Sequence, residues 1–159
     1  MNNIHHTAVI YPNVTIGHNV TIGAFCIIGA PPESKKHHGE DFGVVIGNNV
    51  TIHGHATIDA GATRPTIIDD GAYIMKTVHI GHDAIIHKDV TIAPHAVIGG
   101  FVEIHEETNI GMNATIHQRV TIPAKCMVGM SAVITKKTPI ESNTVLVGNP
   151  ARTTRSNNK

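Results

Sequence analysis

Isoleucine or a similar aliphatic residue recurs at every sixth position through most of this chain. From Ile68 the spacing runs unbroken to Leu146, through fourteen consecutive positions, and two earlier runs at 4–28 and 46–58 show the same spacing. A second small or branched residue, such as Ala96, lies two positions before most of them. A period of six fits neither the 3.6 residues of an α-helical turn nor the alternation of a simple strand. The chain must therefore fold into something more regular than a common globular domain.

This period predicts a β-solenoid, and therefore an all-β protein. If each hexad forms a short strand and a turn, three hexads close a triangular coil of 18 residues. Successive coils then stack at roughly 4.8 Å through parallel ladders, with the repeated isoleucine inside. The composition agrees, because the 159 residues include only three Phe, two Tyr and no Trp. An aromatic ring would not fit in so narrow a prism.

Two segments interrupt the repeat. Residues 31–43, with the sequence PPESKKHHGEDFG, are largely polar, and the repeat returns in phase after them. Between Ile58 and Ile68 the spacing is ten, so residues 61–66 form a smaller insertion that shifts the phase. Loops on a rigid scaffold often carry binding groups, although a plain solvated turn explains the first segment equally well.

We therefore expect one β-helix domain over residues 1–148 with a loop insertion at 31–43, followed by a disordered C-terminal tail at 149–159.

The chain start lacks a signal-peptide pattern, and no apolar run approaches the roughly 18 residues of a membrane span. These features predict a cytoplasmic protein. Cys26 and Cys126 both occupy the small interior position of the repeat, so we expect reduced packing residues.

The charge balance narrows the classes of partner. Twelve Lys and Arg residues match twelve Asp and Glu residues, so the formal net charge is zero. Proteins that follow nucleic acid phosphates or coat anionic membranes carry an excess of positive charge. The scarcity of aromatic rings also argues against base stacking. We expect neither a nucleic acid partner nor a membrane span.

Three motifs carry a resemblance to a known family: GAPPESKKHHGED at 29–41, MKTVHIGHD at 75–83 and IHQ at 116–118. They are similar to the projecting substrate loop, the catalytic segment and a later substrate-contacting segment of the UDP-N-acetylglucosamine acyltransferases of lipid A synthesis. Those enzymes are hexapeptide-repeat acyltransferases. The resemblance implies their fold, a left-handed parallel β-helix with one projecting loop.

The resemblance also implies roles for particular residues. His82 would be the general base, with Asp83 beside it as a catalytic partner. Lys36 would meet the acyl donor or the nucleotide, and His117 and Gln118 would contact substrate. An imidazole suits proton transfer at neutral pH. Adjacent strand residues point to opposite faces, which argues against a contact between His82 and Asp83.

The period of the coil adds an independent prediction. Positions 82, 100 and 118 are 18 apart, so His82, Gly100 and Gln118 should stack along one edge. A thioester is already activated, so its transfer needs a base, donors for the tetrahedral oxyanion and positioning. Gly100 leaves its backbone uncovered at this edge, and its N–H is a candidate oxyanion donor.

Departures from the family pattern bear on the acyl donor. Phe101 stands where the lipid A enzyme has a histidine, and Ser34 replaces a loop aspartate. We expect no counterpart of the helical C-terminal domain of that enzyme, because VLVGNPAR at 145–152 resembles the end of coenzyme A-dependent acetyltransferases. We therefore expect transfer of a short acyl group from acetyl-CoA, with no bound cofactor, to a hydroxyl or amino group of a nucleotide-linked sugar. The alternative is an acyl carrier protein-dependent UDP-N-acetylglucosamine O-acyltransferase.

Two other classes of function remain open. A zinc-dependent γ-type carbonic anhydrase has the same fold, and His82 and His87 have the spacing of its ligand pair, with His53, His55 or His105 as a third ligand. The Arg-Gly-Asp stretch and the Gln-Asp pair of that family are missing, which disfavours it. A catalytically silent scaffold is the third alternative.

The resembled family also implies an oligomer, because its active sites lie between adjacent subunits of a trimer. We expect a homotrimer with three equivalent sites. Each site would take His82 from one chain and loop groups, or groups near His117, from its neighbour.

Overall fold

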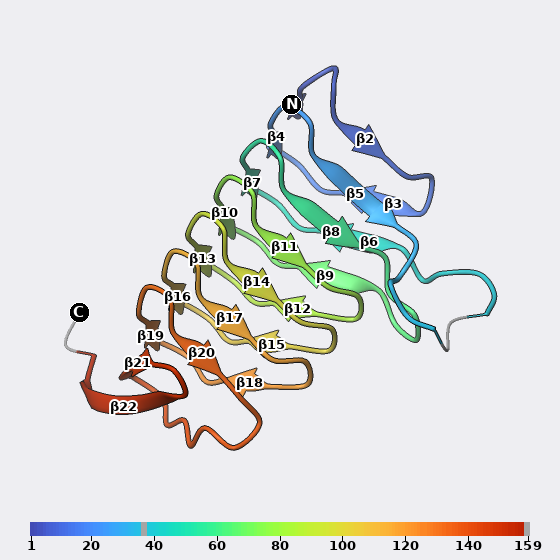
Figure 1. The fold of residues 1–159 in the computed structure, drawn as a ribbon. Coiled ribbons are helices and arrows are strands. Elements are labelled where there is room, and N and C mark those ends of the chain that lie inside the picture. The colour runs from blue at the N-terminus through green and yellow to red at the C-terminus, as the bar shows by residue number, and fades with distance from the viewer. Residues whose placement is uncertain (36–37, 158–159) are drawn as a thin grey trace.

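The computed structural model describes residues 1–35 and 38–157 of the chain. Its short strands form three sheets that are the sides of a triangular coil, and the N- and C-termini lie at opposite ends of the stack (Figure 1). The path from one sheet to the next winds left-handed about the coil axis (Figure 1). The predicted fold, an all-β left-handed parallel β-helix with a projecting loop, is confirmed.

Strands three apart in chain order are neighbours in each sheet, except at the end of the first sheet. The first sheet contains β1 (Asn3–Ile4), β4 (Thr21–Ile22), β7 (Thr51–Ile52), β10 (Tyr73–Ile74), β13 (Thr91–Ile92), β16 (Asn109–Ile110), β19 (Met127–Val128), β21 (Thr144–Gly148) and β22 (Ala151–Ser156). At its end β21 lies next to β19, and β22 lies next to β21. The second contains β2 (Val9–Ile10), β5 (Ile27–Ala30), β8 (Thr57–Asp59), β11 (His79–Ile80), β14 (Val97–Ile98), β17 (Thr115–Ile116) and β20 (Val133–Ile134). The third contains β3 (Val14–Ile16), β6 (Val44–Ile46), β9 (Thr66–Ile68), β12 (Ile85–Ile86), β15 (Glu103–Ile104) and β18 (Thr121–Ile122).

The strand register matches the period of the sequence. Paired isoleucines of β10 and β13 are 18 residues apart, as one coil requires. Those of β5 and β8 are 30 apart, twelve more than one coil, because the loop 31–43 lies between them. Those of β6 and β9 are 22 apart, four more than one coil, because residues 61–66 are inserted there. Both predicted insertions therefore leave the coil after a strand of the second sheet, and the strands that follow pair in the register of the repeat.

The repeated aliphatic side chains form one continuous column inside the coil. Every member from Ile22 to Ile134 is buried, and so are Cys26 and Cys126, both free thiols. Ile4, in the first described coil, is 41% exposed. A fully buried isoleucine stabilises the fold by roughly 1.5–3 kcal/mol, so this column is the main source of stability.

The corners of the coil use left-handed backbone conformations. Among the residues that the structure describes, fifteen that are not glycine have φ between 55° and 62°, and these include Asp83, His95, Phe101 and Arg119. Such a conformation costs an ordinary L-residue roughly 1–2 kcal/mol, which the stacked coils must offset. Side chains at these corners leave the alternating pattern of the strands, and this matters for the candidate site.

The C-terminal segment differs from the disordered tail that we predicted. β22 pairs antiparallel with β21, with Val145 opposite Arg155. The Asn157 side-chain amide also donates to the Lys125 carbonyl oxygen at 2.8 Å. The pairing covers the open edge of the last coil, whose backbone groups would otherwise lack partners.

Within the described chain no helix is long and apolar enough to cross a membrane.

Replacing one isoleucine of the column tests the packing. Ile92 is fully buried, so Ile92→Ala should destabilise the protein by roughly 2–5 kcal/mol through lost burial and a cavity. The free energy of unfolding from urea denaturation measures this. Lys88→Ala is the control, because its side chain is 66% exposed and the change should stay within about 0.5 kcal/mol. Equal stability of the two variants would contradict the proposed core.

Candidate active site

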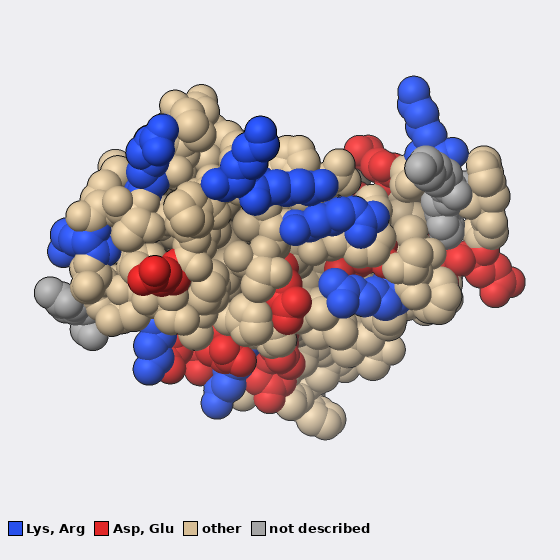
Figure 2. All heavy atoms as spheres, turned by 90° about the horizontal axis from the view of Figure 1, so that it is seen from below, with Lys and Arg blue, Asp and Glu red and all other residues tan. Residues whose placement is uncertain are grey.

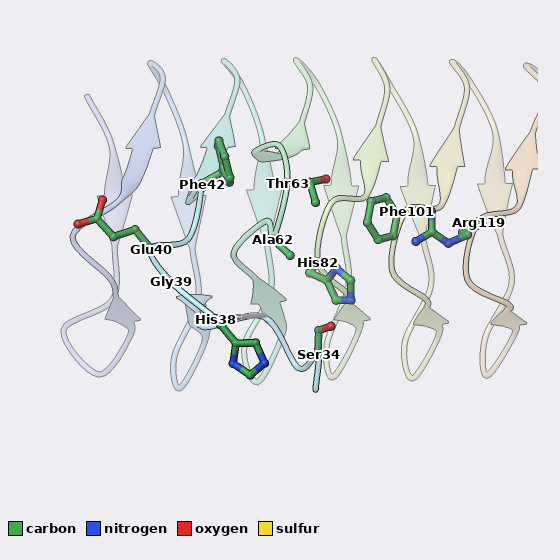
Figure 3. A pocket seen from close by; sticks show the side chains of 10 residues that line it. All are labelled: Ser34, His38, Gly39, Glu40, Phe42, Ala62, Thr63, His82, Phe101 and Arg119. Atoms are coloured by element: carbon green, nitrogen blue, oxygen red, sulfur yellow. The ribbon is translucent and has the colours of Figure 1, made fainter. Parts of the chain in front are cut away.

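A cavity of about 470 Å³ lies between the projecting loop and the corner where the second sheet turns into the third (Figure 3). Its lining comes from three parts of the chain: the loop 31–43, the insertion 61–66 and the corners of successive coils. Among the lining residues are Ser34, Phe42, Thr63, His82, Phe101 and Arg119. Both interruptions of the repeat therefore meet at one place, next to the predicted base.

His82 and Asp83 contact each other directly. The imidazole Nδ1 of His82 lies 2.7 Å from Oδ2 of Asp83. Both residues belong to the corner after β11, where Asp83 has a φ of 60°. The left-handed backbone turns the carboxylate back towards the imidazole, so the alternation of strand side chains does not apply here. Our argument against this contact was wrong for that reason.

The insertion 61–66 surrounds the Asp83 carboxylate, which is fully buried. The backbone N–H groups of Ala62 and Thr63 donate to it at 2.8 Å each, and that of Arg64 at 3.0 Å. The Thr63 hydroxyl donates at 2.6 Å. The sequence indicates this segment only as an insertion that shifts the six-residue spacing. Its role as the source of the donors to Asp83 was missed.

These hydrogen bonds fix the charge of Asp83. Burial by itself raises the pKa of this carboxyl, but the bonds from Thr63, Ala62 and His82 outweigh it and lower the pKa to about 2. Asp83 is therefore ionised at neutral pH, and an ionised carboxylate only accepts hydrogen bonds. The proton between the two residues must then belong to His82 Nδ1. When the ring is neutral, its Nε2 carries a free electron pair.

Gly100 makes room for the imidazole of His82. A Cβ atom at position 100 would lie 2.9 Å from Nε2 and 3.0 Å from Cε1 of His82. The stacking predicted for these two residues is therefore present, and a side chain at position 100 would collide with the ring. Among the hydrogen bonds of residues 1–35 and 38–157, none has the Gly100 N–H as donor.

Phe101 and Arg119 extend the site along the coils (Figure 3). The Phe101 ring lies edge-on to the His82 imidazole, with centroids 5.2 Å apart. The Arg119 guanidinium lies 3.9 Å from the Phe101 ring centroid, a cation–π contact. Arg119 was missed, although its position two coils after Asp83 at the same corner could have indicated it.

The other predicted contacts are not assembled around His82. Lys36 lies outside the described residues. His117 and Gln118 are exposed on the same edge two coils further along, where His117 Nδ1 is 3.0 Å from the Gln118 carbonyl oxygen. Neither lines the cavity of this one chain. Their substrate roles stay predictions.

A second histidine–carboxyl pair lies close by and was also missed. His79 Nδ1 is 2.8 Å from the Thr57 hydroxyl, and its Nε2 is 3.9 Å from Asp59. Burial raises the pKa of the Asp59 carboxyl, and the nearby His79 opposes that shift. The six-residue repeat did not indicate a role for Asp59, because the partner of its carboxyl, His79, lies in a neighbouring coil.

The ligand set of the zinc alternative is not brought together. In the part of the chain that the structure describes, the grouping of side chains close enough to share a metal ion consists of His87, Glu103 and His105. His82 is not a member of this grouping. The described residues of the single chain therefore do not bring His82 and His87 together with a third ligand.

With this geometry established, residues 65–100 match the family model described as "Bacterial transferase hexapeptide (six repeats)". Residues 65–100 thus resemble a bacterial transferase hexapeptide repeat. Its fold superposes on the UDP-N-acetylglucosamine acyltransferase from Bacteroides fragilis with a TM-score of 0.94 and 26% identity, over 98% of this chain and 61% of that one. The enzyme of the same name from Moraxella catarrhalis gives a TM-score of 0.82 and 26% identity, over 98% and 75%. The predicted resemblance is thus confirmed in both repeat and fold.

In sequence, this hexapeptide-repeat chain is 42% identical over 94 residues to the acyl-[acyl-carrier-protein]–UDP-N-acetylglucosamine O-acyltransferase of Thermodesulfovibrio yellowstonii. The match covers 57% of this chain and 36% of that protein, so it spans about a third of the relative's length. The name of this relative specifies an acyl carrier protein as the donor. The donor in this name is the one in our alternative, and it differs from the acetyl-CoA that we expected first.

The buried Asp83 carboxylate predicts a pH dependence of stability. Its pKa falls from an ordinary value of 3.8 to about 2 on folding, so ionised Asp83 stabilises the fold above pH 4. That contribution, about 2 kcal/mol, is lost as the pH falls from 4 to 2. The difference in unfolding free energy between the parent and Asp83→Asn measures it by urea denaturation at several pH values. A difference that stays constant from pH 5 to pH 2 would contradict the assignment.

Proposed function

We propose that this chain acylates a hydroxyl group of a nucleotide-linked sugar, such as UDP-N-acetylglucosamine, with an acyl group from acyl carrier protein. The observation that carries the proposal is the His82–Asp83 pair at the cavity, in which Nε2 is left as the base. The fold and the sequence of the relatives support the same reaction class. The acyl carrier protein replaces acetyl-CoA as the preferred donor for the reason given above.

The reaction follows from the groups at the site. Nε2 of His82 accepts the proton of the sugar hydroxyl while the hydroxyl oxygen attacks the thioester carbonyl carbon. The Gly100 N–H donates to the oxyanion of the tetrahedral intermediate. When the C–S bond breaks, the imidazolium returns its proton to the departing thiolate. The products are a sugar ester and the free thiol, and Asp83 stabilises the transient positive charge on His82.

The Arg119 guanidinium at the cavity suits a nucleotide diphosphate, although the Glu40 carboxylate lines the cavity as well. Figure 2 shows that most Lys and Arg side chains on this face lie along one side, whereas the Asp and Glu side chains gather mainly along the other. Arg119 lines the cavity of His82 and also a neighbouring one of about 320 Å³, which Lys136 lines as well. A guanidinium is well shaped to bind phosphate oxygens. In our proposal Arg119 holds the diphosphate, with Lys36 of the loop as a further contact.

The proposed working form is a homotrimer. Outward-facing apolar side chains of the second sheet support it: Val9 is 52%, Ile27 40% and Val97 42% exposed in the single chain. Burying them against a neighbour would also bring groups near His117 to the cavity of the next chain. The cytoplasmic location stays a prediction.

A donor and acceptor assay tests the function. Purified protein is incubated with acyl carrier protein thioesters of several chain lengths, or with acetyl-CoA, together with UDP-N-acetylglucosamine, and the acylated sugar is detected by mass spectrometry. We expect an O-acyl product with the carrier protein donor at a much higher rate than with acetyl-CoA. A product only with acetyl-CoA would overturn the donor, and no product with any nucleotide sugar would overturn the function.

Replacing the base tests the mechanism within the same assay. His82→Ala should lower kcat by roughly 10²–10⁴-fold, because the hydroxyl then loses its proton acceptor. His95→Ala is the matched control: His95 is an exposed corner histidine whose Nδ1 is bonded to Thr77, and the change should leave turnover unaltered. Retained activity in a folded His82→Ala protein would refute the assigned base.

A further inference from the structure

A cluster of three potential metal ligands lies on the outer side of the third sheet, away from the proposed catalytic cavity. Glu103 belongs to β15, and His87 and His105 directly follow β12 and β15. The Glu103 Oε1 atom is 3.0 Å from Nε2 of His87 and 3.5 Å from Nε2 of His105. One ligand atom from each residue lies within 4.8 Å of the other two. None of the three lines the cavity of His82.

A further carboxylate lies near the other ring nitrogen of each imidazole. Nδ1 of His87 is 3.7 Å from Asp69, and Nδ1 of His105 is 3.8 Å from Glu106. Histidines that bind metals commonly present one nitrogen to the ion and the other to a carboxylate, which orients the ring and strengthens its basicity. Each histidine of the cluster therefore has its Nε2 near Glu103 and its Nδ1 near a second carboxylate.

We propose that His87, Glu103 and His105 bind a divalent transition-metal ion such as Zn²⁺. Two imidazoles and one carboxylate are a ligand set that zinc uses, with a fourth position left for water or another ligand. Imidazole ligands favour Zn²⁺ and Co²⁺ over Mg²⁺ and Ca²⁺. The hydrogen bond from His87 lowers the pKa of the Glu103 carboxyl, so its oxygens are ionised at neutral pH.

Binding requires only a small rearrangement. Ligands at about 2.0–2.2 Å from a tetrahedral ion are roughly 3.3–3.5 Å apart, and both Glu103–histidine distances are already near that range. The two imidazoles are stacked with centroids 4.7 Å apart, so they must tilt towards each other. Their side chains are 23% and 34% exposed, which leaves them room to do so.

Titration of chelator-treated protein with the metal alone tests the proposal. Isothermal titration calorimetry should give one Zn²⁺ per chain and no heat of binding with Mg²⁺. Co²⁺ should give the visible absorption of a four-coordinate site. Because losing an outer partner typically weakens metal binding 10–100-fold, Asp69→Asn should weaken Zn²⁺ binding by about 10-fold, and Glu103→Gln or His105→Ala by at least about 100-fold.

His95→Ala serves as the control, because it removes an exposed histidine outside the cluster and should leave the affinity for Zn²⁺ unchanged. Circular dichroism confirms that each variant is folded. Equal affinity of the parent and the Glu103→Gln and His105→Ala variants would overturn the proposal, and so would the absence of binding to the parent. Neither result would bear on the acyl transfer proposed above.

Discussion

The column of isoleucines in a narrow prism is the constraint on which the rest of the structure depends. Each side chain of the column packs against those 18 residues before and after it, so every coil of the repeat has the same length. A change of one residue in a coil would move the isoleucines off the inner face. Equal coils in turn place residues 18 apart in vertical rows at each corner. One such row stacks Gly100 on His82 in the candidate site.

The two insertions are the places where the chain departs from this rule. Both leave at the corner between the second and third sheets, and the coil resumes its register after each. The longer one forms a wall of the cavity, and the shorter one surrounds Asp83. A carboxylate buried without donors would be strongly disfavoured, so the backbone N–H groups at 62–64 are what allow a charge beside His82. The repeat positions His82, Asp83 and Gly100, and the insertions supply the donors to Asp83 and a wall of the cavity.

The sequence predicted the architecture in detail because the repeat is local and regular. The period gave the coil, the core column, both insertions and the row that stacks His82 on Gly100. The contact between His82 and Asp83 could not be predicted from strand alternation, because it depends on a left-handed corner. The donors from the insertion 61–66 could not be predicted, because that segment does not follow the repeat. The period does place Arg119 in the row of Asp83, and His87 in the row of His105, but it does not show which side chains of a row touch. The pairing of β22 with β21 was missed because the six-residue repeat ends at Leu146, before β22 begins.

The state of the His82 imidazole tests the central claim most directly, because the claim is that Asp83 keeps the proton on Nδ1 and leaves Nε2 as the base. Nitrogen-15 NMR of labelled protein, at a pH where the ring is neutral, distinguishes the two tautomers. We predict a protonated Nδ1 and an unprotonated Nε2 in the parent, with this preference lost in Asp83→Asn. A parent protein whose neutral His82 carries its proton on Nε2 would contradict the account.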